Sequence, residues 1–439
     1  MNKKTLIELL TIFLITLIYN LVFSYVTNDE IWNYGFSYNI ANGLIPYKDF
    51  NMVITPLYPF LASIFLTLFG KNIVIFHIFS AITSTILFYL IKKLVPRGYY
   101  IIYAFLLFHS LPNYSLFCLL LLYILMYMEE KKSNDYLIGI VLGLTFLTKQ
   151  HIGIMLCIPT LFTKDIKKII KGIIGFLIPN IIFLIYLLIS KTLYEFIDYA
   201  FLGITSFAEE NLLISIWMSL TIISIIYLIY QYIKTKDIKI LYILFFQIMA
   251  YPLFDTYHVT LAFLPVLGYF LSKLKLVVKI IRITFLIFII ILFSTKINIY
   301  LKYEHNYPNS TELLHYRNLS PSTEKSIKII TNYIKINKDN IFIIDPNAYL
   351  LKLESNIPLT KYDLLNDGNL GKNGHKKIIE KIDKYCKNNK CLFLMRKEEI
   401  NNNTLSQTNQ EIITYIANTY KEISNISIYT IYGNEYKHE

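Results

Sequence analysis

Two adjacent carboxylates, Asp29 and Glu30, follow directly on the first apolar segment of the chain, residues 5–26. Acidic side chains are costly next to lipid, so they tend to persist there when they face a polar cavity. Aromatic residues, among them Trp32 and Tyr34, come next in the sequence. This arrangement predicts chemistry at the surface of a membrane.

Other polar side chains lie at the ends of later apolar segments, and the distribution of lysines places them all on one side of the membrane. Together with the first pair they come from four separate connections. The set consists of Asp29, Glu30, Lys48, Asp49, Asn113, Lys149, Gln150, His151, Asp255 and His258. Acids, amides, lysines and histidines gathered on one side are typical of a polar site at the boundary of the bilayer.

Each of these residues also has a purely structural interpretation. Asp29 and Glu30 could stabilise the first turn of a helix at the membrane surface, because carboxylates suit helix N-termini. Asn113 could cap a helix that starts after Pro112. His77, which lies inside an apolar segment, carries no clear signal.

The remaining candidates allow similar alternatives. Asp49 could pair only with Lys48, and Lys149 could extend along lipid to reach the headgroups. His258 could be a buried histidine of the core. Residue type alone decides none of these cases, so both interpretations stay open.

Composition places the chain among membrane proteins. Of its 439 residues, 55% are hydrophobic and the mean hydropathy is +0.48, whereas ordinary soluble domains are roughly 45–50% apolar. Apolar runs recur from residue 5 to residue 298, and polar residues become frequent after residue 299. We therefore expect a transmembrane domain over residues 1–298, with residues 27–71 as its first extracytoplasmic loop, and a soluble domain over residues 299–439.

The formal net charge of +12 has two interpretations. A basic protein can bind nucleic acid. Here, however, most basic residues lie in short connections between apolar segments, where they orient a membrane protein. The sequence therefore predicts the lipid bilayer, and no nucleic acid, as a partner of the chain.

The positions of the lysines select one topology. The apolar segments are residues 5–26, 55–69, 73–91, 99–111, 114–128, 136–148, 151–163, 169–190, 212–233, 238–253, 257–272 and 276–298. The segment 55–69 is short and contains prolines, which suits a helix lying along the membrane surface. If it does not cross, every basic cluster falls on the side of the N-terminus. About eleven crossings result, and the first loop and the C-terminal domain lie outside the cytoplasm.

The C-terminal domain has the pattern of an α/β fold. Residues 324–336 and 375–387 have helical periodicity, and residues 341–344 and 391–395 are short apolar runs typical of buried strands. The evenly spaced Gly368, Gly371 and Gly374 do not follow a strand into a helix, which argues against a dinucleotide-binding loop. Cys386 and Cys391 could form a disulfide if the domain is extracytoplasmic.

A family resemblance is visible in the first loop. The pattern consists of residues 28–30 (NDE), 41–50 (ANGLIPYKDF) and 56–70, the last of which begins Pro56-Leu57-Tyr58. It resembles the first extracytoplasmic loop of the GT-C membrane glycosyltransferases, which include protein O-mannosyltransferases and the bacterial lipid A aminoarabinose transferases. Residues 147–150 (LTKQ) resemble a further feature of that family. The resemblance extends over residues 5–300 and is strongest over residues 28–70.

The resemblance implies an enzyme that transfers a sugar from a polyprenyl-phosphate carrier to an extracytoplasmic acceptor, with Asp29 as the general base. We expect an inverting reaction without metal or cofactor, at a bacterial cell membrane. Asp29 and Glu30 are then the catalytic candidates, and Lys149 is the first candidate for binding the phosphate, ahead of Lys48 and His258. The other candidates for substrate binding are Asp49, Asn113, Gln150, His151 and Asp255.

The chain departs from the family at one place, and two other functions remain as alternatives. The aminoarabinose transferases carry an acid and a lysine just before the first-loop proline, whereas Ile54 and Thr55 precede Pro56 here. The pattern therefore does not support a metal ion in this loop. A transporter or flippase of lipid-linked sugars would need a polar path through the membrane and often has paired repeats. A non-catalytic membrane scaffold with a binding domain is the other alternative.

Overall fold

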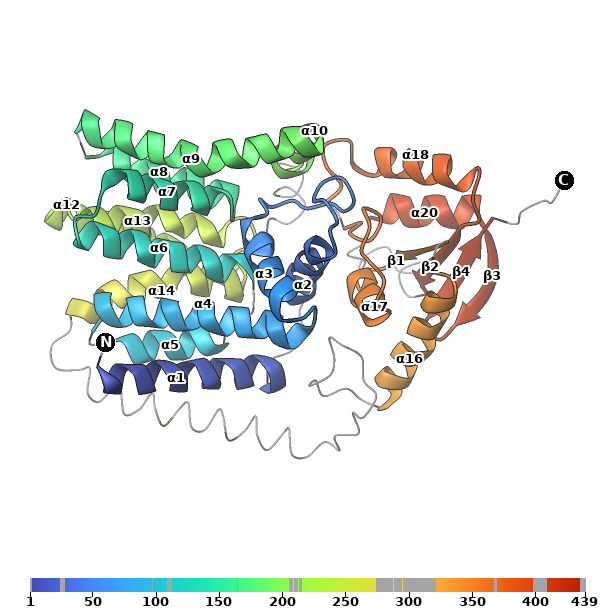
Figure 1. Ribbon diagram of the computed structural model, residues 1–439, viewed down its shortest axis with the longest axis horizontal. Coiled ribbons are helices and arrows are strands. Elements are labelled where there is room, and N and C mark those ends of the chain that lie inside the picture. Colours follow the sequence, from blue (N-terminus) through green and yellow to red (C-terminus); the bar gives the residue numbers. More distant parts are fainter. Residues whose placement is uncertain are drawn as a thin grey trace.

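The computed structural model has two parts, a long helical bundle and a smaller α/β domain beside one end of it (Figure 1). It describes residues 2–23, 28–96, 98–108, 113–163, 165–204, 208, 212, 215–273, 287, 294, 321–338, 340–366, 369–397 and 409–434. The predicted domain boundary at residue 298 and nearly all of the predicted crossing at residues 276–298 lie outside these residues.

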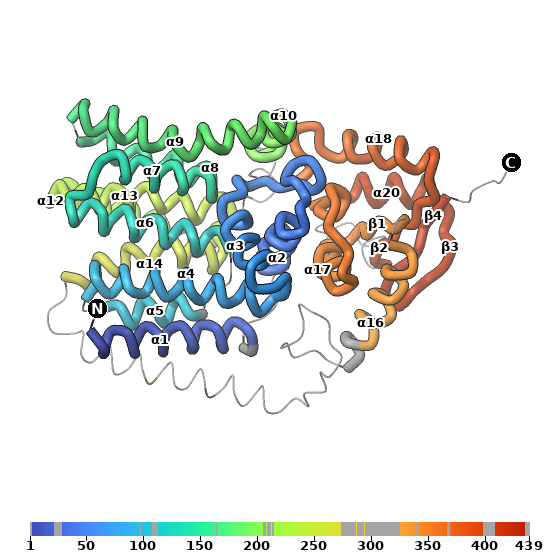
Figure 2. The backbone as a smooth tube through the Cα atoms, viewed as in Figure 1, coloured from blue at the N-terminus to red at the C-terminus, as the bar shows by residue number. Residues whose placement is uncertain are grey.

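Most helices of the first part run side by side along the long axis of the molecule (Figure 2). Their bounds are α1 Lys3–Ile18, η1 Tyr19–Phe23, α2 Asn28–Ala41, α3 Leu57–Phe69, α4 Ile73–Leu94, α5 Tyr99–Phe108, α6 Tyr114–Glu130, α7 Asp135–Phe146, α8 Gln150–Leu161, α9 Ile166–Ser190, α10 Leu193–Ile197, η2 Asp198–Leu202, α12 Ile216–Thr235, α13 Ile238–Phe246, η3 Gln247–Ala250 and α14 Thr256–Lys273.

Polar residues directly before the apolar runs determine where many of these helices begin. The side chains of Asn72, Asn134 and Asp165 accept hydrogen bonds from backbone N–H groups in the first turns of α4, α7 and α9. Ser215 and Asp237 do the same for α12 and α13. Such caps satisfy N–H groups that have no partner within the helix.

The apolar segments are largely helical where the structure describes them, but the lengths of the helices differ. Among the described residues, four helical stretches are long and apolar enough to cross a membrane, namely Lys3–Leu21, Ile73–Leu94, Ile166–Ser190 and Ile216–Thr235. Helices α7 and α8 have 12 residues each, whereas a spanning helix needs about 20. The number of crossings therefore remains a prediction.

Helices α7 and α9 pack backbone against backbone. A Cβ atom at Gly139 would lie 2.1 Å from the carbonyl oxygen of Gly172, and one at Gly175 would lie 2.1 Å from that of Tyr136. Small residues allow this close approach between helices in membranes. Both helices end at the same end of the bundle (Figure 1). The contact therefore fixes the position of α7 along the axis of α9.

The first loop fills the space between the bundle and the α/β domain. Helices α2 and α3 lie at the end of the bundle (Figure 1), and their apolar side chains form one buried cluster with residues of α4 and of α17 (Ala348–Glu354). This is the arrangement expected of a helix at the membrane surface. The position of α3 relative to a bilayer stays a prediction.

The α/β domain contains a sheet whose described strands lie in the order β1-β2-β4-β3. Strands β1 and β2 are parallel, and β4 is antiparallel to both β2 and β3. The bounds are α16 Pro321–Ile336, β1 Ile341–Ile344, α17 Ala348–Glu354, α18 Gly374–Cys386, β2 Leu392–Arg396, α20 Gln410–Thr419, β3 Lys421–Ile426 and β4 Tyr429–Gly433.

Helices cover both faces of this sheet. Phe342 and Ile344 of β1 pack in one cluster with residues of α18 and α20, and Ile341 and Ile343 pack in another with residues of α16 and α17. Successive side chains of a strand point to opposite faces, so a strand covered on both sides reads as an unbroken apolar run. The two predicted helices and two predicted strands are confirmed, whereas α17, α20, β3 and β4 were not predicted.

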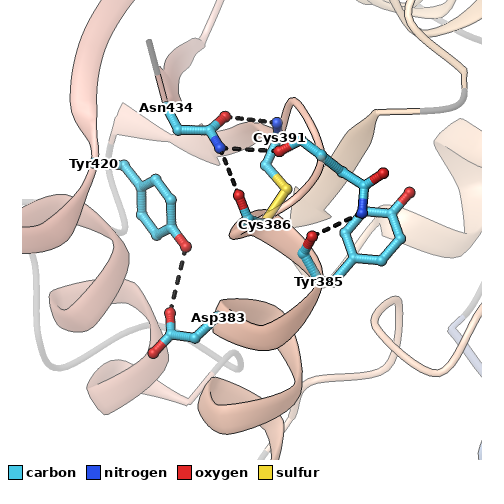
Figure 3. The surroundings of a disulfide bond; sticks show 7 residues. Asp383, Tyr385, Cys386, Cys391, Tyr420 and Asn434 are labelled. Carbon is cyan, nitrogen blue, oxygen red and sulfur yellow. Dashed lines mark hydrogen bonds between the residues drawn. A yellow bond between two sulfur atoms is a disulfide. The ribbon is translucent and has the colours of Figure 1, made fainter. Parts of the chain in front are cut away.

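Cys386 and Cys391 form a disulfide (Figure 3). The side chain of Asn434 accepts a hydrogen bond from the backbone N–H of Cys391, at 2.7 Å, and donates one to the carbonyl of Cys386, at 2.9 Å. The short connection between α18 and β2 is therefore closed by a covalent bond and by hydrogen bonds from the last described residue of the domain.

Candidate active site

The two adjacent carboxylates lie in the first turn of α2, where the structural interpretation also expected them. Glu30 is buried and contacts the equally buried His77 of α4, with 2.9 Å between Oε1 and Nε2. This contact holds the start of α2 against α4. Glu30 is thus engaged by the protein itself, and His77, which had no clear role in the sequence, is its partner.

Asp29 has a different environment. Its carboxylate makes no hydrogen bond among the described residues, although its backbone carbonyl accepts one from Asn33 at 2.7 Å. Burial raises the pKa of Asp29 above the usual aspartate value, because it disfavours the charged form, while the positive charges of His258 and Lys149 act in the opposite direction. Asp29 therefore lies within electrostatic reach of Lys149 and His258.

Lys149 precedes α8 at its N-cap position and is only 6% exposed. Its Nζ lies 3.4 Å from Ser115 Oγ, 3.7 Å from Met249 Sδ and 5.2 Å from the centre of the Tyr114 ring. Burial lowers the pKa of Lys149, and the nearby Cys118, Asp29 and Asp255 partly offset this. Among the described residues, no carboxylate forms an ion pair with it.

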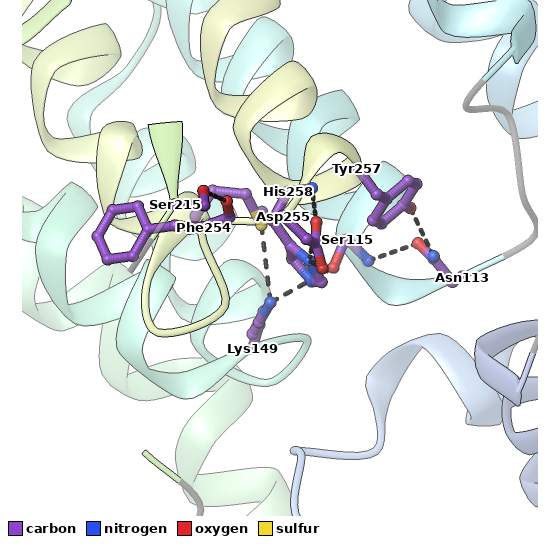
Figure 4. A network of polar contacts seen from close by, with 9 residues as sticks. Asn113, Ser115, Lys149, Ser215, Phe254, Asp255, Tyr257 and His258 are labelled. Carbon is purple, nitrogen blue, oxygen red and sulfur yellow. Dashed lines mark hydrogen bonds and ion pairs between the residues drawn. The ribbon is translucent and has the colours of Figure 1, made fainter. Parts of the chain in front are cut away.

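His258 and Asp255 lie at the start of α14. The carboxylate of Asp255 contacts His258 Nδ1 at 2.9 and 3.0 Å and accepts a hydrogen bond from the His258 backbone N–H. This holds the ring in one orientation, with Nε2 on the side away from Asp255. Figure 4 shows residues from the starts of α6 and α14 meeting Lys149 at this place.

Gln150 joins the lysine turn, which is the connection between α7 and α8 over residues 147–150, to two other segments. Its Nε2 donates hydrogen bonds to the carbonyls of Val53, at 3.0 Å, and Ala200, at 2.7 Å. The first loop is tied to the same turn by the backbone N–H of Leu57, which donates to the carbonyl of Leu147 at 2.8 Å. Gln150 therefore positions its neighbour Lys149.

Asn113 has the capping role that the structural interpretation gave it. Its Oδ1 accepts hydrogen bonds from the backbone N–H groups of Ser115 and Leu116, at 2.9 and 3.0 Å. Its Nδ2 donates to the hydroxyl of Tyr257 in α14. Asn113 thus fixes α6, which carries Ser115, against α14, which carries His258.

Three further candidates are less clearly connected to this cluster. Lys48 is exposed, and Asp49 accepts a hydrogen bond from the backbone N–H of Ile45 within its own turn, at 2.7 Å. The structure shows no ion pair between the two. His151 follows Gln150 in α8, and its Nε2 is buried without a hydrogen-bond partner among the described residues.

The cluster therefore brings Asp29, Lys149, Asp255 and His258 together, with Gln150 and Asn113 as supports. Sequence reasoning missed Ser115 and Met249, and it gave no role to His77 or Tyr257. His77 and Tyr257 lie near the start of their helices, so the sidedness of the lysines places them at the same end of the bundle. Within the part of the chain that the structure describes, no group of three His, Cys, Asp or Glu side chains could hold a metal ion.

The comparison with known proteins gives a likeness in structure alone. No protein-family model and no curated protein matches the sequence. The structure of ArnT from Cupriavidus metallidurans in the apo state matches with a TM-score of 0.59 and 12% identity, over 98% of this chain and 97% of that chain. The structure of the same protein bound to undecaprenyl phosphate matches with a TM-score of 0.55 and 12% identity, over 98% of each chain.

A further match, to an oligosaccharyltransferase from Archaeoglobus fulgidus, has a TM-score of 0.42 and 11% identity over 89% of this chain and 68% of that chain, and no conclusion rests on it. The two ArnT structures, by contrast, cover almost the entire chain. The chain therefore has the fold of ArnT, a GT-C aminoarabinose transferase, and this is the fold that the resemblance in the first loop implies.

Proposed function

We propose that this protein is a membrane glycosyltransferase that transfers a sugar from a polyprenyl-phosphate-linked donor to an extracytoplasmic acceptor. The observation that carries the proposal is Lys149, a buried ammonium group whose contacts among the described residues are neutral and which lies near Asp29, a carboxylate with no hydrogen bond within that part of the chain. A buried charge is costly without a partner. A phosphate would supply that partner, and ArnT, which has the same fold, binds undecaprenyl phosphate.

The proposed reaction is a single displacement with inversion. Asp29 removes the proton from an acceptor hydroxyl, and the resulting oxygen attacks the anomeric carbon of the donor sugar. The bond between that carbon and the phosphate oxygen breaks, and polyprenyl phosphate leaves with the electron pair. General-base catalysis of this kind contributes roughly 10²–10⁴-fold to the rate.

Lys149 and His258 have supporting roles in this proposal. The leaving phosphate gains negative charge in the transition state, and a fixed cation next to it stabilises that charge. Lys149 is placed for this by Gln150, and His258 is oriented by Asp255. The reaction needs no metal ion in this scheme, which predicts full activity in the presence of a chelator.

We also propose that about eleven segments cross the membrane, with the N-terminus in the cytoplasm and both the first loop and the α/β domain outside a bacterial plasma membrane. The disulfide supports this orientation, because such bonds persist in oxidising compartments. Single cysteines at the exposed positions Lys93 and Lys384 test it. A membrane-impermeant thiol reagent should label Lys384→Cys in intact cells and leave Lys93→Cys unlabelled, and the reverse pattern would refute the topology.

The catalytic test is Asp29→Asn, which keeps the size of the side chain but removes the base. We expect transfer from a polyprenyl-phosphate sugar, assayed with the full chain in liposomes, to fall by at least about 10²-fold. Asp165→Asn is a matched control, because Asn caps a helix as well as Asp does and Asp165 caps α9 at the opposite end. Near-normal turnover by Asp29→Asn would remove Asp29 as the base. Movement of the donor across the membrane without transfer would favour the transporter.

A further inference from the structure

Beyond its role in the bundle, the segment after α9 is joined to the α/β domain by a buried carboxylate. After α9 ends at Ser190, the chain forms α10 and then η2, whose first residue is Asp198. Asp198 is 2% exposed. Its Oδ2 lies 2.9 Å from Lys377 Nζ of α18, and its Oδ1 accepts a hydrogen bond from the backbone N–H of Lys372 at 3.0 Å. One carboxylate thus binds the α/β domain with both oxygens.

Two glycines make this contact possible. Gly371 has a φ of +73°, and a Cβ atom there would lie 2.8 Å from Asp198 Oδ2. A Cβ atom at Gly203, just after η2, would lie 2.9 Å from the Cα of Gly371. Any larger residue at either position would therefore separate the two backbones.

The same short segment also contacts the site. Two residues after Asp198, the carbonyl of Ala200 accepts the 2.7 Å hydrogen bond from Gln150. Gln150 is 3% exposed and its second amide hydrogen is committed to Val53, so the side chain has no freedom to follow if Ala200 moves. Its backbone neighbour is Lys149.

We propose that the α/β domain positions Lys149 for the donor phosphate through Asp198, η2 and Gln150. This inference rests on the proposed function and deepens it. Asp198 and Lys377 are positioning residues in this proposal, because they act on the donor through Gln150 and Lys149. An event in the α/β domain that shifts α18, such as binding of an acceptor there, would change the affinity for the donor.

The domain is also held by contacts that bypass this connection. Asn39 of α2 donates a hydrogen bond to the carbonyl of Leu359 and accepts one from its backbone N–H, both at 3.2 Å. Asn51 donates to the carbonyl of Lys361 at 3.0 Å. Loss of Lys377 therefore leaves the domain attached, and its effect can be separated from undocking.

The test compares Lys377→Met with Lys384→Met, an identical change at an exposed position of the same helix. With the full chain in liposomes, we expect Lys377→Met to raise the KM for the polyprenyl-phosphate sugar about tenfold. It should also lower kcat, by a smaller factor, because Lys149 keeps its charge and is displaced but not removed from the phosphate. Lys384→Met should match the wild type, and Lys377→Arg, which keeps the cation, should recover most of the affinity.

A second measurement distinguishes coupling from a local structural defect. If the path runs through Gln150, then Lys377→Met combined with Gln150→Leu should raise KM no more than the stronger single change, whereas independent effects would multiply. Multiplied effects, or an unchanged KM in Lys377→Met, would overturn the coupling while leaving the proposed function intact. Failure of the wild type to bind radiolabelled undecaprenyl phosphate or to transfer sugar would overturn the proposed function, and the coupling with it.

Discussion

Two buried lysines, one in each part of the molecule, have opposite surroundings. Lys149 in the bundle is 6% exposed and Lys352 in the α/β domain is 4% exposed. Lys352 Nζ lies 2.7 Å from the carboxylate of Asp363, which also accepts hydrogen bonds from the backbone N–H and hydroxyl of Thr360. Lys149 has a hydroxyl, a thioether and an aromatic ring around it.

The difference separates a structural charge from a functional one. In the α/β domain the desolvation of Lys352 is offset within the folded chain, because Asp363 and its hydrogen bonds complete the pair. In the bundle the desolvation of Lys149 is offset only in part, which costs stability and leaves the site able to attract an anion. Equal burial of the same residue type therefore does not mean equal function.

The largest effect is expected for Lys352→Met, which leaves Asp363 buried without its cation. Breaking a buried pair in this way costs about 3–5 kcal/mol of unfolding free energy. Thermal unfolding should show a strong loss of stability, while sugar transfer per folded molecule stays normal. The double variant Lys352→Met with Asp363→Leu should regain much of the stability. A specific loss of donor affinity in Lys352→Met would contradict a purely structural role.

Lys149→Met should have the converse effect. Removing one fixed donor to a developing anion costs about 10²–10³-fold in rate, and we expect this loss in the transfer rate and in the use of the donor. Stability should be unchanged or higher, because an uncompensated buried charge is replaced by an apolar side chain of similar length. Steady-state kinetics and thermal unfolding of the same sample measure both quantities. Destabilisation as large as that of Lys352→Met would end the contrast between the two lysines.

The pH dependence of kcat/KM sharpens the comparison further. Asp29 must be unprotonated to act as a base, so activity falls as the pH drops through its pKa, which burial raises above the usual aspartate range. Lys149 must be protonated, so activity falls again as the pH rises through its pKa, which burial lowers below the usual lysine range. We expect the acid limb of the pH profile to lie above the usual pKa of aspartate and the alkaline limb to lie below the usual pKa of lysine. Lys149→Met should remove the alkaline limb. An acid limb at the usual aspartate value would argue against a buried base.

The smallest effect is expected for Glu30→Gln. Because Glu30 contacts His77, the change should cost less than about tenfold in kcat, the size of one ordinary hydrogen bond. Activity and thermal stability should decline together. A loss as large as that of Asp29→Asn would assign the catalytic role to Glu30.

Much of the fold follows from composition along the chain. The apolar segment 73–91 corresponds to α4, Ile73–Leu94, because long apolar runs with capping residues before them have few alternatives to a helix. Strand β3, by contrast, has the sequence KEISNI and is exposed along most of its length. It is defined by its pairing with β4 and not by its own pattern, so the sequence contains little signal for it.

For the candidate site, the sequence predicts a shared location. The sidedness of the lysines predicts that Asp29, Lys149 and His258 lie at one end of the bundle, and in the structure the charge of Lys149 acts to lower the pKa of Asp29. The partner of Glu30 could not be predicted, because the contact with His77 depends on how α2 docks on α4. Among the described residues, Lys48 has no contact with this cluster. Asp49 closes its own turn with a local hydrogen bond. Residue type alone does not reveal either arrangement.

The glycines between α7 and α9 have a consequence for mutational tolerance. An alanine at Gly139 or Gly175 would force α7 to slide along α9 or to separate from it, because carbonyl oxygens occupy the space of the new methyl group. The lysine turn follows α7, and the segment with Ala200 follows α9 after the short helix α10, so a slide would misalign the hydrogen bond from Gln150. In a scan of all single substitutions, these two positions should therefore score with the proposed donor-binding residues, although they lie in the contact between α7 and α9.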